Sequence, residues 1–220
     1  MGEEECSLFK EGYSYVAGVD EAGCGALAGP VVAACCMLPL IFDKKKGKIL
    51  DPSFRRKLEG LKDSKKLSPK QRLFFFNLLT QNPLVKWEAA FVMPSTIDSI
   101  NILQARLLAM QWAIESFSPS IQYALIDGNY APPKLTIPTK AIVKGDSLVL
   151  SIMAAAVIAK VLRDEWMCKA AQLWKEYGFA SHFGYGVKKH FAALQLYGPC
   201  SIHRKSFLKN ISNSLPTSFS

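Results

Sequence analysis

Short runs of apolar residues alternate along the chain with longer stretches of helical periodicity. Runs at Tyr15–Asp20, Pro30–Leu38 and Val85–Val92 are bounded by polar or glycine-rich segments, which predicts three strands. Shorter runs at Tyr123–Ile126 and Ala141–Val143 predict two more. Because the strands are grouped early in the chain, we expect an α/β fold with a mixed rather than a fully parallel sheet.

Helical patterns separate and follow these strands. Ser68 suits the cap of a helix and Pro69 its first turn. Apolar residues at helical spacing predict a long helix over Ser95–Phe117, and an alanine-rich stretch predicts another over Ser147–Tyr177. A shorter helix is expected at Lys188–Tyr197.

The pattern shows neither an internal repeat nor a second domain. We expect one catalytic domain over residues 1–220, with a helical C-terminal extension at about 178–207 and a frayed tail at 208–220. Residues 43–66, rich in Lys and Arg, are interpreted as a solvated excursion.

Charge is distributed unevenly along the sequence. The net charge is +9, and residues 134–220 hold 12 Lys and Arg against 4 Asp and Glu, whereas the preceding residues are nearly balanced. A basic half favours a polyanionic partner such as nucleic acid, although basic proteins without that role are common. The six cysteines form no C-x-x-C pair, which argues against zinc and for a reducing compartment. With no signal-peptide or membrane-span pattern, we expect a cytoplasmic monomer.

Carboxylates follow three of the predicted strands. Asp20 and Glu21 end the first, Asp127 ends the fourth, and Asp146 follows the fifth. Strand ends carry sites in open α/β sheets, and clustered carboxylates repel one another unless a cation neutralises them. Hard oxygen ligands suit Mg²⁺ or Mn²⁺, and a pair of such ions can clamp a phosphodiester. Taken singly, Asp127 also fits an ordinary turn residue and Asp146 a helix N-terminal charge.

Several motifs occur in a fixed order from about residue 15 to 207. They are Gly18–Val32, Asp63–Ser68, Ile126–Asn129, Lys144–Ser147, Ala159–Asp164, Gly184–Gly186 with His190, and His203–Phe207. Together they resemble the signature of bacterial ribonuclease HII, in the type 2 ribonuclease H family. The related HIII type carries an extra N-terminal domain, so the HII branch is expected.

The resemblance implies a ribonuclease H-like fold, a mixed five-stranded sheet flanked by helices with a small helical C-terminal part. It implies an endoribonuclease that hydrolyses the RNA strand of RNA/DNA hybrids and cuts on the 5′ side of single ribonucleotides embedded in duplex DNA. Asp20, Glu21, Asp127 and Asp146 match the catalytic carboxylates, which hold two Mg²⁺ or Mn²⁺ ions. One ion activates water and the other stabilises the leaving oxygen, so the products carry 3′-hydroxyl and 5′-phosphate ends.

The family also recognises the ribose 2′-hydroxyl, the group that separates RNA from DNA. The resemblance places this role on Gly23, Cys24, Gly25 and Tyr185. Each has a plainer interpretation as well: the glycines form an ordinary tight turn, and Tyr185 is a packed loop aromatic. The remaining candidate contacts to nucleic acid are Ser64, Lys65, Lys66, Lys144, Lys188, Lys189 and Arg204.

The sequence departs from the family at one position. The family usually has arginine between the two glycines, and this chain has Cys24. A thiol cannot replace a guanidinium on a phosphate. We therefore expect Cys24→Arg to tighten duplex binding, unless another residue already fills that role.

Two alternatives remain from the residues. One is another nuclease with the same type of sheet, such as a junction resolvase or an exonuclease, against which the ordered motifs argue. The other is a non-catalytic nucleic-acid-binding module, against which the complete set of four carboxylates argues.

Overall fold

Five strands form one mixed sheet in the computed structural model, which describes residues 3–43, 47–117 and 121–209. They are β1 (Val16–Ala22), β2 (Val31–Met37), β5 (Lys86–Val92), β6 (Tyr123–Asp127) and β7 (Thr139–Ile142). The order across the sheet is β5-β2-β1-β6-β7. β1 is antiparallel to β2 and β2 to β5, whereas β1 is parallel to β6 and β6 to β7. The predicted mixed five-stranded sheet is therefore confirmed.

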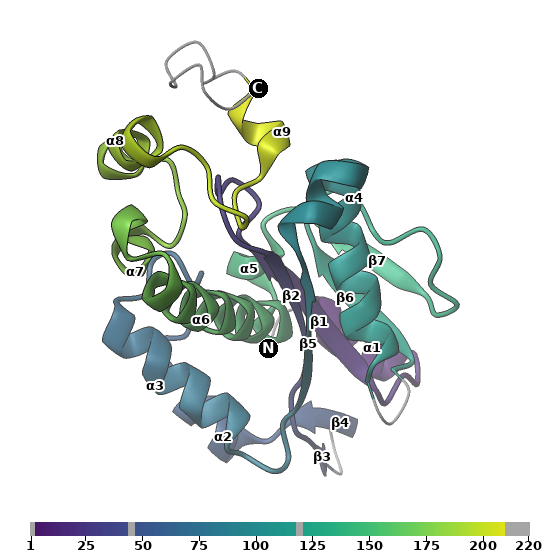
Figure 1. Cartoon of the computed structure of the whole chain (residues 1–220). Coiled ribbons are helices and arrows are strands. Elements are labelled where there is room, and N and C mark those ends of the chain that lie inside the picture. Colours follow the sequence, from purple (N-terminus) through teal and green to yellow (C-terminus); the bar gives the residue numbers. More distant parts are fainter. Residues whose placement is uncertain (1–2, 44–46, 118–120, 210–220) are drawn as a thin grey trace.

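Helices cover both faces of this sheet (Figure 1). On one face lies α6 (Leu150–Leu173), backed by α2 (Pro52–Lys57) and α3 (Pro69–Thr80), and on the other lies α4 (Pro94–Glu115). The close approach of α6 depends on Gly18 in β1, because a Cβ there would lie 2.2 Å from the backbone of the helix.

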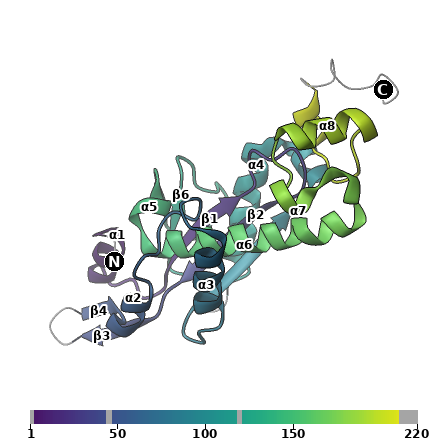
Figure 2. The same ribbon diagram turned by 90° about the vertical axis from the view of Figure 1, so that its left-hand side faces the viewer.

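A small helical part lies at one end of the sheet (Figure 2). It consists of α7 (Phe179–His182), α8 (Lys188–Tyr197) and α9 (Lys205–Leu208). The remaining elements are α1 (Glu3–Lys10), the two-stranded sheet of β3 (Leu40–Asp43) and β4 (Gly47–Leu50), α5 (Gly145–Leu148) and the 3₁₀ turn η1 (Lys175–Tyr177). Most of the predicted tail, residues 210–220, lies outside the described residues.

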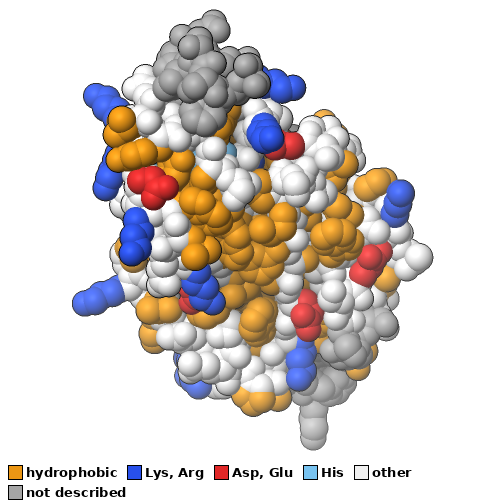
Figure 3. All heavy atoms as spheres, viewed as in Figure 1, with side chains coloured by type: hydrophobic (Ala, Val, Ile, Leu, Met, Phe, Trp, Pro, Cys, Tyr) orange, Lys and Arg blue, Asp and Glu red, His pale blue; other side chains and the backbone are white. Residues whose placement is uncertain are grey.

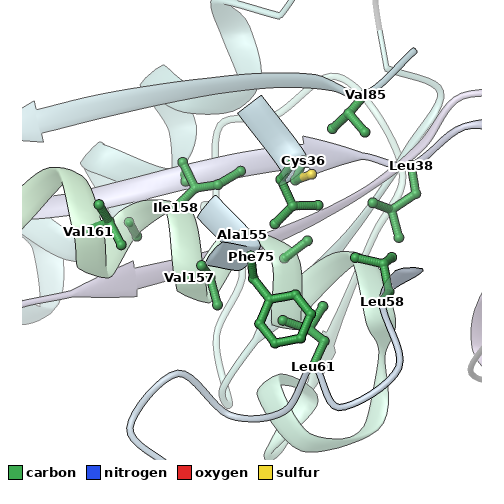
Figure 4. Packing of buried hydrophobic residues seen from close by; sticks show 14 of the residues in the cluster. Cys36, Leu38, Leu58, Leu61, Phe75, Val85, Ala155, Val157, Ile158 and Val161 are labelled. Carbon is green, nitrogen blue, oxygen red and sulfur yellow. The ribbon is translucent and has the colours of Figure 1, made fainter. Parts of the chain in front are cut away.

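The interpretation of residues 43–66 as a solvated excursion is wrong. The segment contains β4 and α2, and it buries Leu50, Phe54, Leu58 and Leu61. These side chains belong to the core cluster formed with α3 and α6, part of which Figure 4 shows. The lysines and arginines dominate the composition of the segment, but its few apolar side chains decide where it packs, since their burial removes apolar surface from water.

Two predicted long helices are interrupted. The stretch expected as one helix over residues 147–177 is divided at Val149, which is extended (φ −117°, ψ 123°), and α6 ends at Leu173 before η1. Helix α4 is broken at Asn101 (φ 67°, ψ 167°), whose side-chain oxygen accepts from the backbone N–H of Gln104 at 3.1 Å. Asn101 thus caps the second segment of α4, as an asparagine can.

The face shown in Figure 3 carries both hydrophobic and charged side chains. Hydrophobic side chains gather down the middle of the face in Figure 3, where the edge strand β5 lies, and charged side chains are spread around it. Among the described residues, no helix has the length and apolar character needed to cross a membrane.

Candidate active site

Three carboxylates from separate elements converge at one end of the parallel strands. Asp20 lies in β1, Asp127 ends the neighbouring β6, and Asp146 lies in the first turn of α5. Each offers an oxygen within 4.8 Å of the others. The backbone N–H of Asp146 donates to Oδ1 of Asp127 at 3.2 Å, which fixes α5 against the end of β6. Parallel pairing of β1 and β6 brings their ends together.

The electrostatics of this group favour a bound cation. Burial raises the pKa of Asp20 well above its usual value, and the charges of Glu21 and Asp127 raise it further. Burial also raises the pKa of Asp127. Asp20 is only 6% exposed, so little water is available to offset the repulsion. A hard divalent cation with oxygen ligands fits this donor set.

Glu21 lies beside this group but outside it. Its Oε1 accepts from the thiol of Cys24 at 3.3 Å, and its Oε2 lies 3.4 Å from Nη2 of Arg106 in α4. Burial raises the pKa of Glu21, and the charge of Arg106 counteracts that effect. The structure thus brings together three of the four predicted carboxylates and turns the fourth toward α4.

The residues predicted to contact nucleic acid occupy different positions around the three aspartates. Lys65 is exposed, and its Nζ lies 3.8 Å from Oδ2 of Asp146. Burial lowers the pKa of Lys65, but the charges of Asp20 and Asp146 outweigh it and raise the pKa. Lys144 is exposed at the cap of α5 with φ 58°, whereas Ser64 is buried.

Two buried arginines hold the glycine turn, Gly23–Gly25, in place. A Cβ on Gly23 (φ +97°) would lie 2.0 Å from Nε of Arg163, so this position requires glycine. The guanidinium of Arg163 also lies 5.2 Å from the centre of the Tyr185 ring, which connects the turn to that ring. Arg204 is fully buried, and its Nη1 donates to the carbonyl of Cys24 at 3.0 Å. The burial of Arg204 gives no support to the predicted phosphate contact. Instead, Arg204 stabilises the glycine turn from the interior of the protein.

A chain of histidine hydrogen bonds ends at the backbone of Tyr185. The N–H of Cys200 donates to Nδ1 of His203 at 2.9 Å, so His203 carries its proton on Nε2 and donates to Nε2 of His190 at 3.0 Å. His190 then donates from Nδ1 to the carbonyl of Tyr185 at 3.0 Å. Both imidazoles are neutral in this arrangement. Burial lowers the pKa of each to about 4.

This histidine chain predicts a loss of stability in mild acid. Because the folded pKa of His203 lies below its unfolded value of 6.5, the unfolded state binds more protons between about pH 6.5 and 4. The free energy of unfolding should therefore fall more in the wild type than in His203→Gln between pH 7 and pH 5, by roughly 2 kcal/mol. Urea unfolding at both pH values measures this, and the comparison cancels the carboxylates common to both proteins. Equal losses in the two proteins would contradict the neutral assignment.

Sequence reasoning overlooked two of these arginines as site residues. Arg163 lies within a recognised motif, but its contacts with the turn and with Tyr185 could not be read from spacing. Arg106 stands between the buried Ala105 and Leu107, and a charged residue inside an otherwise apolar helical stretch was the available signal.

Comparison with known proteins agrees with this geometry. The family model of ribonuclease HII matches residues 17–210. Ribonuclease HII of Chlamydia trachomatis is 46% identical over 209 residues, covering 93% of this chain and 89% of the relative. That of Caldicellulosiruptor saccharolyticus is 44% identical, covering 95% and 94%. Ribonuclease H2 from Pyrococcus horikoshii OT3 superposes with a TM-score of 0.68 at 27% identity, covering 91% of this chain and 98% of that one. Bst-RNase HIII in complex with Mn²⁺, at 15% identity and a TM-score of 0.59 over 85% and 64% of the two chains, is similar in fold.

The fold and the group of three aspartates place the protein in the class of metal-dependent ribonucleases of the ribonuclease H type. Within that class, the chain belongs to the ribonuclease HII family. Membership implies endoribonuclease activity on RNA/DNA hybrids, so the resemblance read from the ordered motifs is confirmed.

Proposed function

We propose that this chain hydrolyses the RNA strand of RNA/DNA hybrids and also cuts duplex DNA on the 5′ side of a single embedded ribonucleotide. The observation that carries the proposal is the convergence of Asp20, Asp127 and Asp146 at the strand ends that lead into the glycine turn. Asp20 and the turn are separated by only two residues, so a sugar held at the turn places its phosphodiester near the carboxylates.

The three aspartates, joined by Glu21, would hold two Mg²⁺ or Mn²⁺ ions. When bound, such ions activate water and stabilise the leaving 3′-oxygen, which accounts for 3′-hydroxyl and 5′-phosphate products. Mn²⁺ is the ion named for Bst-RNase HIII, a neighbour in fold. The chain's own contribution is to position the carboxylates: Glu21 lies between Cys24 and Arg106, and Asp127 is held against the N-terminus of α5.

The ribose would be bound and recognised between the glycine turn and Tyr185. Gly25 is exposed and a Cβ there would meet nothing within 4 Å, which leaves the turn open to close approach by a sugar. Tyr185 is half-buried over Arg163, so its ring is held from behind and the histidine chain holds its backbone. Lys65 and Lys144 are exposed beside the carboxylates and can contact phosphates.

We also propose that one chain suffices, as a single catalytic domain with its helical extension at about 178–207. Asp20, Asp127 and Asp146 converge within one folded chain, and the extension brings Tyr185 to the turn through Arg163. A cytoplasmic location fits its free cysteines, because a reducing compartment keeps thiols from forming disulfides.

Mapping the ends of the products tests the proposed reaction. A duplex with one ribonucleotide should yield a single cut immediately 5′ of it, a 3′ end that a polymerase extends, and a 5′ end that already carries phosphate. EDTA should prevent the cut. A 2′,3′-cyclic phosphate, or cleavage that persists in EDTA, would contradict metal-dependent hydrolysis.

A further inference from the structure

Arg106 reaches from helix α4 into the acidic centre. It lies in the segment of α4 that Asn101 caps, between the buried Ala105 and Leu107. Its Nη2 lies 3.4 Å from Oε2 of Glu21 and 3.4 Å from the carbonyl oxygen of Asp127. A guanidinium thus bridges the ends of β1 and β6, the two strands that carry the site.

The hydrogen-bonding capacity of this guanidinium is incompletely used. Nε of Arg106 is buried and has no hydrogen-bond partner among the described residues, although Oε2 of Glu21 lies close to Nη2. Buried donors are normally paired, so an unpaired one calls for an explanation. The side chain is 21% exposed, so part of it faces solvent beside the carboxylates.

Arg106 also flanks the position where the chain departs from its family. The carboxylate of Glu21 accepts from the thiol of Cys24 through Oε1 and contacts Arg106 through Oε2. The two residues therefore stand on either side of one side chain. Arg163 and Arg204 also lie near the turn, but both are fully buried, and Arg204 donates to the carbonyls of Gly29 and Cys24. Of these three arginines, only Arg106 reaches solvent.

We propose that Arg106 supplies, from helix α4, the phosphate-binding guanidinium that the turn lacks because of Cys24. Its ligand is a phosphodiester of the bound duplex, next to the ribose at the glycine turn, so the inference rests on the proposed function. A guanidinium presents five donors in a planar fork that matches a phosphate. Anchoring by Glu21 and Asp127 restricts the side chain before the substrate arrives, which lowers the entropy lost on binding. A purely structural Arg106 would instead support Glu21 without contacting the substrate.

Duplex binding separates these two roles. Affinity is measured by fluorescence anisotropy in EDTA, at several salt concentrations, for an all-DNA duplex and for the same duplex with one ribonucleotide. The variants are Arg106→Gln, Cys24→Arg and the double variant. The matched control is Lys140→Gln, which also removes one positive charge, here from a half-exposed pair with Glu4.

We expect Arg106→Gln to bind about tenfold more weakly than Lys140→Gln at low salt, the scale of a hydrogen bond to a charged group. The slope of log affinity against log salt should become shallower by about 0.9, the loss of one phosphate contact. Cys24→Arg should bring no gain in the wild type, yet restore most of the affinity in the Arg106→Gln background, since a new guanidinium then fills a vacant role.

Three results would overturn the proposal. Arg106→Gln could match Lys140→Gln in affinity and salt slope, which leaves Arg106 a structural role. Cys24→Arg could tighten binding equally in both backgrounds, which makes the two positions independent. If Arg106→Gln does not fold, Arg106→Lys replaces it: we expect weaker binding with an unchanged slope, and unchanged affinity overturns the assignment. Wild-type cleavage of the ribonucleotide duplex is assayed separately, so failure of the proposed function is distinguished from failure of this inference.

Discussion

Asp20→Asn is expected to reduce cleavage below detection with either Mg²⁺ or Mn²⁺ while the protein still binds duplex. Asparagine keeps the shape of the side chain but removes the charge that attracts the cation, and Asp20 is the most buried of the three converging carboxylates. A gel assay on a single-ribonucleotide duplex measures the cleavage, and anisotropy measures the binding. Substantial cleavage by the variant would remove Asp20 from the metal centre.

The same substitution should stabilise the metal-free protein at neutral pH. The folded pKa of Asp20 is raised, chiefly by burial and then by the charges of Glu21 and Asp127. A group with a raised folded pKa costs stability once the pH exceeds its unfolded value near 3.9, so the cost is present at pH 7 and absent in stronger acid. Thermal unfolding in EDTA should therefore show a higher Tm for Asp20→Asn at pH 7, with a gap that narrows toward pH 4. A lower Tm for the variant at pH 7 would indicate that Asp20 is stabilised by partners rather than strained.

Replacing the single ribose by deoxyribose is expected to suppress cleavage by about 10⁴-fold or more, while duplex affinity changes little. A site built to hydrogen-bond one hydroxyl leaves its own buried polar groups unpaired when that hydroxyl is absent. Affinity depends mainly on phosphate contacts, which both duplexes share. Rates and affinities measured on the matched pair of duplexes test this, and comparable cleavage of both would exclude reading of the 2′-hydroxyl.

Tyr185 should contribute to this selectivity chiefly through its ring. The ring lies over the Arg163 guanidinium, which in turn contacts the turn at Gly23. Tyr185→Phe keeps that packing and loses only the hydroxyl, so it should erode the ribose preference less than Tyr185→Ala. Equal effects of the two substitutions would assign the selectivity to the hydroxyl alone.

Much of the fold was predictable because its elements have strong local signals. The apolar runs of β1 and β2 are buried along their length, and Ser68 caps α3 as predicted, in a capping box with Gln71. Local sequence patterns did not predict the structure where packing between distant segments determines it. The basic composition of residues 43–66 concealed the burial of Phe54, and nothing in an alanine-rich stretch marks the break at Val149.

The candidate site was predictable to the extent that it follows strand ends. Asp20 and Asp127 come together because β1 and β6 are parallel neighbours, a pairing that the strand positions alone do not specify. The direction of Glu21 and the burial of Arg204 depend on side chains from distant segments, so spacing could not reveal them. Arg106 enters the site from a helix that the motifs do not include.

Cleavage of three duplexes tests whether a single ribose directs a metal-dependent cut. These are all-DNA, one embedded ribonucleotide, and four consecutive ribonucleotides, each with Mg²⁺, with Mn²⁺ and in EDTA. We predict that the second and third are cut with at least one of the ions, that the all-DNA duplex stays intact, and that nothing is cut in EDTA. Cleavage of the four-ribonucleotide duplex alone, under both ions, would contradict recognition of a single ribonucleotide.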